Sequence, residues 1–436
     1  MDVHASPDTL PELQTFLGNF QVRFRRPEAR AALERYTTGL LTEIPNKNCD
    51  TLARAVPGSS EQRLQGFLTT MDWDEEDLNR QRVQFMIATA TLGDGVLILD
   101  DTGFAKQGQA SVGVARQYSG TLGKVGNCQV AVTCCYSDPL ATWPVGVRLY
   151  LPESWTQDPD RCRKARVPTV VGFQTKPQIA LGLLDQARAL GVPHRCVVAD
   201  ADYGDNPNFL AGLEARGEPY VVGIRTDFRV WVSDPGRGRS RRVDQVLATV
   251  PRGCWCTIPW RRGSKGWLRK KFVALSCWRR TPSGVMRAGW LLGERPARGQ
   301  RGEQKYYWSN LPDSTSLEKL AEYAHRRHAI EQFHEEAKGE LGWDQYQGRR
   351  WRGFHRHGVT VMLAYSFLVW LEVQQRRAQQ SPGRPRDPFS PSAGPAAEGA
   401  TSSASGSGPM AAPPGGVVVG DHGGVHSAIL SQELTK

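Results

Sequence analysis

The spacing of hydrophobic residues changes along the 436-residue chain, and each spacing predicts a different kind of structure. Near the N-terminus, apolar side chains recur three or four positions apart, as at Ala29, Leu33, Tyr36 and Leu40. This period is typical of amphipathic helices. We therefore predict that residues 1–88 form a small helical domain.

Residues 89–225 alternate between short apolar runs and helical periods. Three predicted strands come first, followed by helix, strand, helix and strand; the strand and helix sequences are VLILDD, NCQVAVTCCYSD, TWPVGVRLYLP, PQIALGLLDQARALG, RCVVAD, NPNFLAGLEARG and PYVVGIR. This order predicts an α/β core in which helices pack on a mixed sheet.

Three further zones follow the predicted core. Short β-branched and aromatic runs punctuated by Gly and Pro predict a separate β-rich insertion at residues 226–312. Helical patterning returns in residues 313–378, which we interpret as the second part of the core. Residues 379–436 are rich in Pro, Ser, Ala and Gly, and this composition predicts a disordered low-complexity tail.

Charge and cysteine usage narrow the class of protein. The chain carries a formal net charge of +11, which favours a polyanionic partner such as nucleic acid. The sequence shows neither a signal-peptide pattern nor an apolar run long enough to span a bilayer, so we expect a soluble, cytoplasmic protein with no membrane partner. The nine cysteines are interpreted as reduced thiols, with a zinc site at Cys254 and Cys256 as a weak alternative.

Three carboxylates stand where a metal site is expected. Asp101 and Asp200 each follow an apolar strand, and strand ends place ligand-binding residues side by side in open sheets. Glu331 lies on a predicted helix and shares one face with Arg327 and Lys338, four residues before it and seven after it. Each residue alone is readily explained as a cap or a surface ion pair. The order of Asp-bearing strand, Asp-bearing strand and Glu-bearing helix is the stronger signal.

These segments resemble the DDE transposases of bacterial insertion sequences, closest to insertion-sequence family seven-hundred-and-one. The resemblance rests on DDTGFAKQGQASVGVARQYSG, VVADADYGDNPNFLAGLEARG and RRHAIEQFHEEAKGELGWDQYQGRRWRGFHRH, and it covers roughly residues 16–375. Arg327, Glu331 and Lys338 match the family's Tyr-Arg-Glu-Lys signature, whereas Ala324 stands at the tyrosine position. Asp100 and Asp202 compete for the aspartate roles. The family's first aspartate directly precedes Thr, which favours Asp101.

The resemblance implies an RNase H-like fold and a magnesium-dependent chemistry. Asp101, Asp200 and Glu331 would then hold two Mg²⁺ ions, for which Mn²⁺ can substitute, and Arg327 and Lys338 would bind a DNA phosphate. The expected partners are double-stranded DNA, both terminal inverted repeats and target DNA, and a second copy of the chain in a homodimeric synaptic complex. Such a protein would be associated with the nucleoid, and its N-terminal helical domain would bind the DNA end.

The insertion has the composition of a DNA-binding surface. Residues 225–280 contain fifteen Lys and Arg against three Asp, a net charge of +12. Five tryptophans are interleaved with these cations and could stack on unpaired bases, although a core role for the tryptophans is an equal alternative. The residues proposed to contact DNA are Arg261, Arg262, Lys270 and Lys271, together with Arg349 and Arg350 beyond the glutamate helix.

We therefore predict a cut-and-paste DNA transposase that uses a DDE triad. The main alternative is a catalytically inactive or domesticated descendant that binds DNA as a regulator. A structure-selective nuclease without strand transfer is a third reading.

Overall fold

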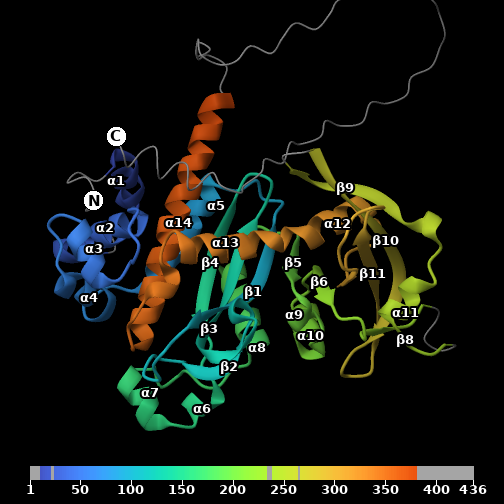
Figure 1. Cartoon of the computed structure of the whole chain (residues 1–436), viewed down its shortest axis with the longest axis horizontal. Coiled ribbons are helices and arrows are strands. Elements are labelled where there is room, and N and C mark those ends of the chain that lie inside the picture. The colour runs from blue at the N-terminus through green and yellow to red at the C-terminus, as the bar shows by residue number, and fades with distance from the viewer. Residues whose placement is uncertain (1–9, 21–23, 233–237, 264–265, 381–436) are drawn as a thin grey trace, which may run out of the picture.

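The computed structural model describes residues 10–20, 24–232, 238–263 and 266–380 (Figure 1). The predicted low-complexity tail lies outside the described residues from position 381 onward. One continuous set of buried apolar residues runs from the N-terminal helices through the sheet to the last helix.

Helices occupy the N-terminal segment, in agreement with its apolar period. These helices are α1 (Pro11–Gly18), α2 (Pro27–Leu41), α3 (Cys49–Ala55), α4 (Glu61–Thr69) and α5 (Glu75–Thr89). Local capping explains where several begin: Asn48 forms a capping box with Thr51, and Asp74 accepts from two backbone amides of α5. The limits of this segment as an independent domain stay a prediction.

The core sheet combines four strands that pair antiparallel with two strands that pair parallel. Its strands are β1 (Val96–Ala105), β2 (Ala115–Ser119), β3 (Lys124–Ser137), β4 (Thr142–Leu149), β5 (Cys196–Ala199) and β6 (Tyr220–Ile224). β3 pairs antiparallel with both β1 and β4, while β5 lies parallel to β1 and β6 lies parallel to β5. The predicted mixed α/β fold is therefore confirmed, with the strand order of an RNase H-like core.

Helices cover both faces of this sheet. The helices between the core strands are α6 (Glu153–Thr156), α7 (Pro159–Ala165), α8 (Lys176–Ala189), α9 (Ala201–Gly204) and α10 (Pro207–Ala215). Ten consecutive residues of β3, from Cys128 to Ser137, are all buried. A strand that is covered on both faces needs apolar residues at successive positions rather than only at alternate ones, which explains the predominance of apolar residues in this stretch, where the polar Gln129, Thr133 and Ser137 are buried as well.

The basic insertion continues the core sheet instead of forming a separate β element. Its elements are β7 (Arg229–Val230), β8 (Arg241–Arg242), α11 (Val243–Ala248), β9 (Cys256–Gly263), β10 (Gly266–Arg280), β11 (Met286–Pro296) and β12 (Lys305–Ser309). β12 pairs antiparallel with β6, and β11, β10 and β9 follow outward to complete a ten-stranded sheet. The free hydrogen-bonding edge of β6 is what joins the insertion to the core.

Three helices complete the described chain: α12 (Leu317–Arg326), α13 (His328–Gly339) and α14 (Trp351–Gln380). α13 crosses the strands of the core sheet, and α14 runs between the sheet and the N-terminal helices (Figure 1). Buried Arg356 on α14 donates to the backbone oxygens of Phe67 and Trp73, which satisfies its guanidinium inside the core. Among the helices described, none is long and apolar enough to cross a membrane.

Candidate active site

The register of the parallel strands brings Asp100 and Asp200 together. Leu99 on β1 pairs with Ala199 on β5, so the next residue of each strand, Asp100 and Asp200, occupies neighbouring positions. Adjacent strands lie about 4.8 Å apart, and paired residues point to the same face. The two carboxylates therefore lie side by side at the point where β5 ends, while β1 continues to Ala105.

Burial and repulsion by neighbouring carboxylates raise the pKa of both carboxyl groups. Burial raises the pKa of Asp100 well above its usual value, the charge of Asp200 raises it further, and Arg327 opposes both effects. Burial, followed by the charge of Asp202, likewise raises the pKa of Asp200. One oxygen of Asp200 caps α9 by accepting from the amides of Asp202 and Tyr203 at 2.9 and 3.3 Å. Asp200 thus serves both as the predicted cap and as a member of the carboxylate pair.

Arg327 connects this pair to Glu331. The guanidinium of Arg327 lies 3.3 Å from the Asp100 carboxylate and also donates to Glu331. His328 Nδ1 lies 3.0 Å from the other oxygen of Glu331. The hydrogen bond from His328 and the charge of Arg327 hold the pKa of Glu331 below its usual value. Glu331 is therefore ionised, and the guanidinium of Arg327 bridges it to Asp100.

Asp101 has a different direct partner, although, after burial, its charge is one of the causes that raise the pKa of Asp100 and of Asp200. Successive side chains of a strand point to opposite faces, so Asp101 points away from the face that Asp100 and Arg327 share. Its carboxylate lies 3.0 Å from Lys176 Nζ at the start of α8. The structure thus places Asp200 and Arg327 beside Asp100, and Lys176 beside Asp101. The catalytic role predicted for Asp101 stays a prediction. The parity of β1, combined with the parallel register to β5, is the signal that separates these adjacent residues.

A buried histidine fixes the glutamate helix on the sheet. Nε2 of His334 on α13 lies 2.8 Å from the hydroxyl of Thr133, which in turn donates to the backbone oxygen of Asp100 at 3.1 Å. Burial lowers the pKa of His334 to about 3, so the ring is neutral. No specific role was predicted from the sequence for the histidines near Glu331. The structure gives His334 a docking contact and places His328 against Glu331.

Lys338 is engaged within the protein. Its ammonium donates to the backbone oxygen of Gly103 at 2.9 Å and to the hydroxyl of Thr121 at 3.0 Å. Burial lowers the pKa of Lys338 to about 8. Because Gly103 lies three residues beyond Asp100 on β1, these bonds tie the end of α13 to the strand that carries the first carboxylate.

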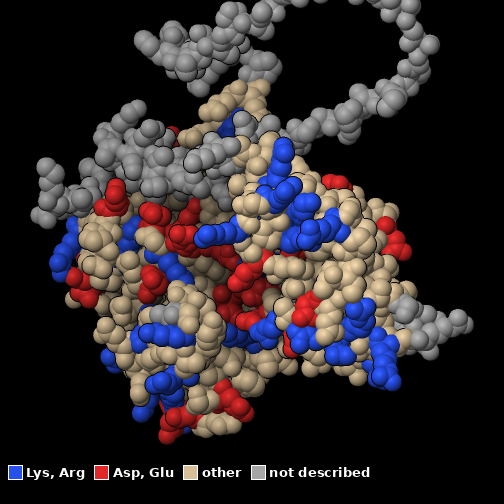
Figure 2. Space-filling model, turned by 45° about the vertical axis from the view of Figure 1, so that its right-hand side comes forward, with Lys and Arg blue, Asp and Glu red and all other residues tan. Residues whose placement is uncertain are grey.

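The predicted DNA-contacting cations differ in their surroundings. Lys270 is paired with the buried Glu294, Lys271 and Arg350 are half-buried, and Arg349 is exposed. The side chains of Arg261 and Arg262 lie outside the described part of the chain. Figure 2 shows one hollowed face on which acidic side chains gather at the centre and Lys and Arg lie on its borders. This arrangement places cations around an acidic hollow.

Some tryptophans of the insertion are buried in its core and others are exposed, so each of the two roles considered from the sequence applies to part of the set. Trp255 is 4% exposed and packs in the core of the insertion, whereas Trp267 is 49% exposed. Trp260 packs against His325. Only part of this set is available to stack on a base.

The carboxylates do not form a finished metal cluster. Among the described residues, no three His, Cys, Asp or Glu side chains converge as a ready-made metal site. The structure does not support the alternative zinc site either, because Cys254 and Cys256 are exposed free thiols. Asp100, Asp200 and Glu331 nevertheless offer only carboxylate oxygens, the ligands that Mg²⁺ and Mn²⁺ prefer.

Comparisons with known families agree with this geometry. A family model described as "DDE superfamily endonuclease" matches residues 19–266, and one described as "Transposase DDE domain" matches residues 174–367. The chain belongs to the DDE superfamily. The predicted resemblance to DDE transposases is therefore confirmed, and a divalent metal ion is expected to be required for DNA cleavage.

A similar protein of known sequence also supports this family assignment. The chain is 26% identical over 340 residues to the "Probable transposase for insertion sequence element IS701" of Microchaete diplosiphon, a match that covers 74% of this chain and 78% of the relative. Together with the family models, this match identifies the chain as an insertion-sequence DDE transposase, a DNA-cleaving enzyme. The inactive-regulator alternative is not favoured.

A solved structure with a weak overall likeness is the NurA nuclease from Sulfolobus solfataricus. It aligns with a TM-score of 0.25 at 8% identity, over 57% of this chain and 80% of that one.

Proposed function

We propose that this transposase cleaves both ends of its insertion sequence and joins the freed 3′-hydroxyls to target DNA, using Asp100, Asp200 and Glu331 as its DDE triad. The observation that supports this choice is the register that sets Asp100 beside Asp200, with Arg327 reaching from Asp100 to Glu331. Asp100 takes the place that the sequence analysis gave to Asp101.

Two Mg²⁺ ions are the proposed cofactors, with Mn²⁺ as a substitute. Two crowded carboxyl groups whose pKa values are raised by burial and repulsion form a site that a divalent cation would relieve. When bound, such ions would supply activation of the nucleophile and stabilisation of the leaving oxyanion. Asp100, Asp200 and Glu331 would hold them.

The residues around the triad set its geometry. Thr133 and His334 fix the backbone at Asp100, and Lys338 fixes the same strand at Gly103. Arg327 supplies the positive charge between Asp100 and Glu331. We propose that Arg327 turns toward a DNA phosphate when the carboxylates bind metal, since its charge is then no longer needed between them.

DNA contact is proposed to involve Lys271, Arg349 and Arg350, together with Arg261 and Arg262 on β9. The half-buried and exposed cations among them lie in the insertion and directly before α14, and clustered cations bind the phosphate backbone without regard to sequence. The proposed substrates are terminal inverted repeats and target DNA, bound by two copies of the chain.

A plasmid assay tests the proposal. Supercoiled DNA carrying paired inverted repeats, taken from the sequence that flanks the coding region, is incubated with protein and Mg²⁺. We expect double-end cleavage by the wild type and no cleavage by Glu331→Gln, with DNA-end affinity unchanged, because the substitution removes charge from the triad but leaves the DNA-binding cations. Cleavage by Glu331→Gln at the wild-type rate would remove the triad assignment.

A further inference from the structure

A second buried carboxylate lies outside the triad, in the insertion. Glu294 on β11 is 1% exposed. It accepts hydrogen bonds from Tyr307 on β12 at 2.8 Å, from His325 Nε2 on α12 at 2.9 Å, and from Lys270 on β10. A buried carboxylate without partners is strongly destabilising, so these donors together keep the charge inside the protein.

Glu294 remains ionised in spite of its burial. Burial alone would raise its pKa, but hydrogen bonds and charge from His325 and Lys270 outweigh this effect and bring the pKa of Glu294 to about 2. Burial lowers the pKa of His325. Nε2 of His325 donates to Glu294 whether the ring is neutral or protonated, so the contact does not depend on the protonation state of the ring.

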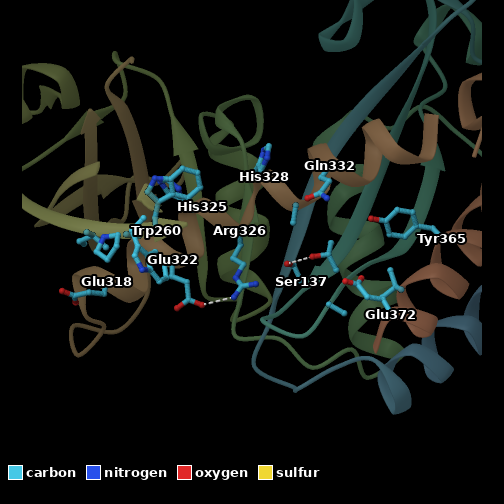
Figure 3. A pocket seen from close by; sticks show the side chains of 18 residues that line it. Ser137, Trp260, Glu318, Glu322, His325, Arg326, His328, Gln332, Tyr365 and Glu372 are labelled. Atoms are coloured by element: carbon cyan, nitrogen blue, oxygen red, sulfur yellow. Dashed lines mark hydrogen bonds and ion pairs between the residues drawn. The ribbon is translucent and has the colours of Figure 1, made fainter. Parts of the chain in front are cut away.

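Aromatic rings hold His325 in place. Its ring centroid lies 4.2 Å from that of Trp260 on β9 and 5.5 Å from that of Phe272 on β10. Lys270 Nζ lies 5.3 Å from the Trp260 centroid. Figure 3 shows His325 and Trp260 side by side, and both line a cavity of about 380 Å³ to which α12, α13, α14 and β9 contribute residues. Residues Trp260, Lys270, Glu294, Tyr307 and His325 are called the Glu294 cluster below.

The Glu294 cluster is connected to the catalytic helix α13 through His325 at the end of α12. His325 lies in the last turn of α12, and Arg327 stands between the end of α12 and the start of α13. The side chain of Arg327 contacts Asp100 and Glu331. A shift of His325 would therefore move Arg327 and the first turn of α13, which carries Glu331.

We propose that the Glu294 cluster positions the catalytic helix, with Glu294 and His325 as positioning residues that couple the DNA-binding insertion to Arg327 and Glu331. The cluster joins four strands of the insertion to the α12–α13 junction, so a displacement of the insertion displaces the third carboxylate. Lys270 belongs to this cluster and is not available as a DNA contact. The inference rests on the proposed role of Glu331.

Three variants test the coupling under single-turnover conditions with saturating paired-end DNA. A misplacement of about 1 Å in an active site lowers rates by about 10²-fold, so we expect His325→Ala and Glu294→Gln to lose about 30- to 100-fold in cleavage rate. Their affinity for the DNA end should stay close to that of the wild type. His325→Gln should recover a large part of the rate, because its amide can donate to Glu294 from the position of Nε2.

A matched control separates positioning from stability. Glu214 on α10 is also a largely buried carboxylate; it accepts from Tyr220 at 2.9 Å and from Arg279 of β10, which is 3% exposed. Glu214→Gln therefore breaks a similar link between the insertion and the core at a place remote from α13. We expect Glu214→Gln and Glu294→Gln to lower the thermal midpoint similarly, while only Glu294→Gln loses cleavage at temperatures where both are folded.

The outcomes are distinct. Wild-type cleavage by folded His325→Ala or Glu294→Gln, an equal loss in Glu214→Gln, or a failure of His325→Gln to recover the rate would overturn the positioning role. If Glu331→Gln is inactive in the same series, those results leave the triad standing. If Glu331→Gln cleaves normally, the proposed function itself fails, whatever the cluster variants do.

Discussion

Replacing each of two adjacent aspartates separately tests the register that defines the active site. Asp100→Asn and Asp101→Asn are the same isosteric change at successive positions of β1. Asp100 is 13% exposed, lies 3.3 Å from Arg327 and is the neighbour of Asp200, whereas Asp101 is 19% exposed and lies 3.0 Å from Lys176 on the other face. The two variants therefore remove a charge from opposite sides of one strand.

The expected effects differ by orders of magnitude. A metal site supplies several kcal/mol of transition-state stabilisation, and about 4 kcal/mol corresponds to a factor of about 10³ in rate. We expect Asp100→Asn to lower paired-end cleavage by at least that factor. Asp101→Asn loses a partly exposed ion pair worth at most about 1 kcal/mol, so its rate should stay within about fivefold of the wild type.

Two measurements decide between the residues. Single-turnover cleavage of a supercoiled plasmid with paired ends gives the rates, and Mn²⁺ binding followed by electron paramagnetic resonance gives metal affinity without catalysis. Asp100→Asn should weaken Mn²⁺ binding and Asp101→Asn should not. If folded Asp101→Asn is inactive while Asp100→Asn cleaves and binds Mn²⁺ normally, the reasoning from strand parity and register is refuted.

Three other predictions concern the metal, a buried lysine and the DNA-binding cations. Ca²⁺ in place of Mg²⁺ should support DNA-end binding without cleavage, because Ca²⁺ prefers longer and looser coordination; rapid cleavage in Ca²⁺ alone would contradict the site. Burial lowers the pKa of Lys47 to about 8 in the folded protein. Between that pH and the ordinary lysine pKa of about 10.4, Lys47 is protonated in the unfolded chain but largely neutral in the folded protein. The free energy of unfolding should therefore rise with pH across this window, by about 3 kcal/mol. Denaturant titrations at both ends of the window should show a smaller rise in Lys47→Met, and an equal rise would exclude Lys47 as the source. Replacing Arg349 and Arg350 together by alanine should lower the slope of log affinity against log salt by about 1.8 if each contacts a duplex phosphate; an unchanged slope in a binding titration would mean that both side chains face solvent.

The fold class could be predicted because local pattern and global fold agree in this chain. Strand-length apolar runs, helical periods and caps such as Thr175 with Gln178 specify the order of elements. That order, with a meander of strands before the helix-linked ones, leaves few arrangements of a mixed sheet. The short strand β2 was not predicted, because its residues form no apolar run. The attachment of the insertion to the edge of β6 was not predictable, because strand pairing between distant segments leaves no periodic signal in either of them.

For the carboxylates too, part of the information lies in the sequence and part only in the tertiary structure. The sequence by itself was enough to propose Asp200, Glu331 and the Asp100–Asp101 pair as candidates, since each stands at a predicted strand end or on a polar helix face. Only the tertiary structure distinguishes the surroundings of the two adjacent aspartates, on which the proposal of Asp100 rests, because the direction of a side chain depends on strand parity relative to a partner strand about a hundred residues away. It also placed Lys270 beside Glu294 and Lys338 beside Gly103. From composition alone, Lys270 and Lys338 look like surface charges. Their contacts in the structure depend on the oxygens of Glu294 and Gly103, which only long-range packing brings within reach.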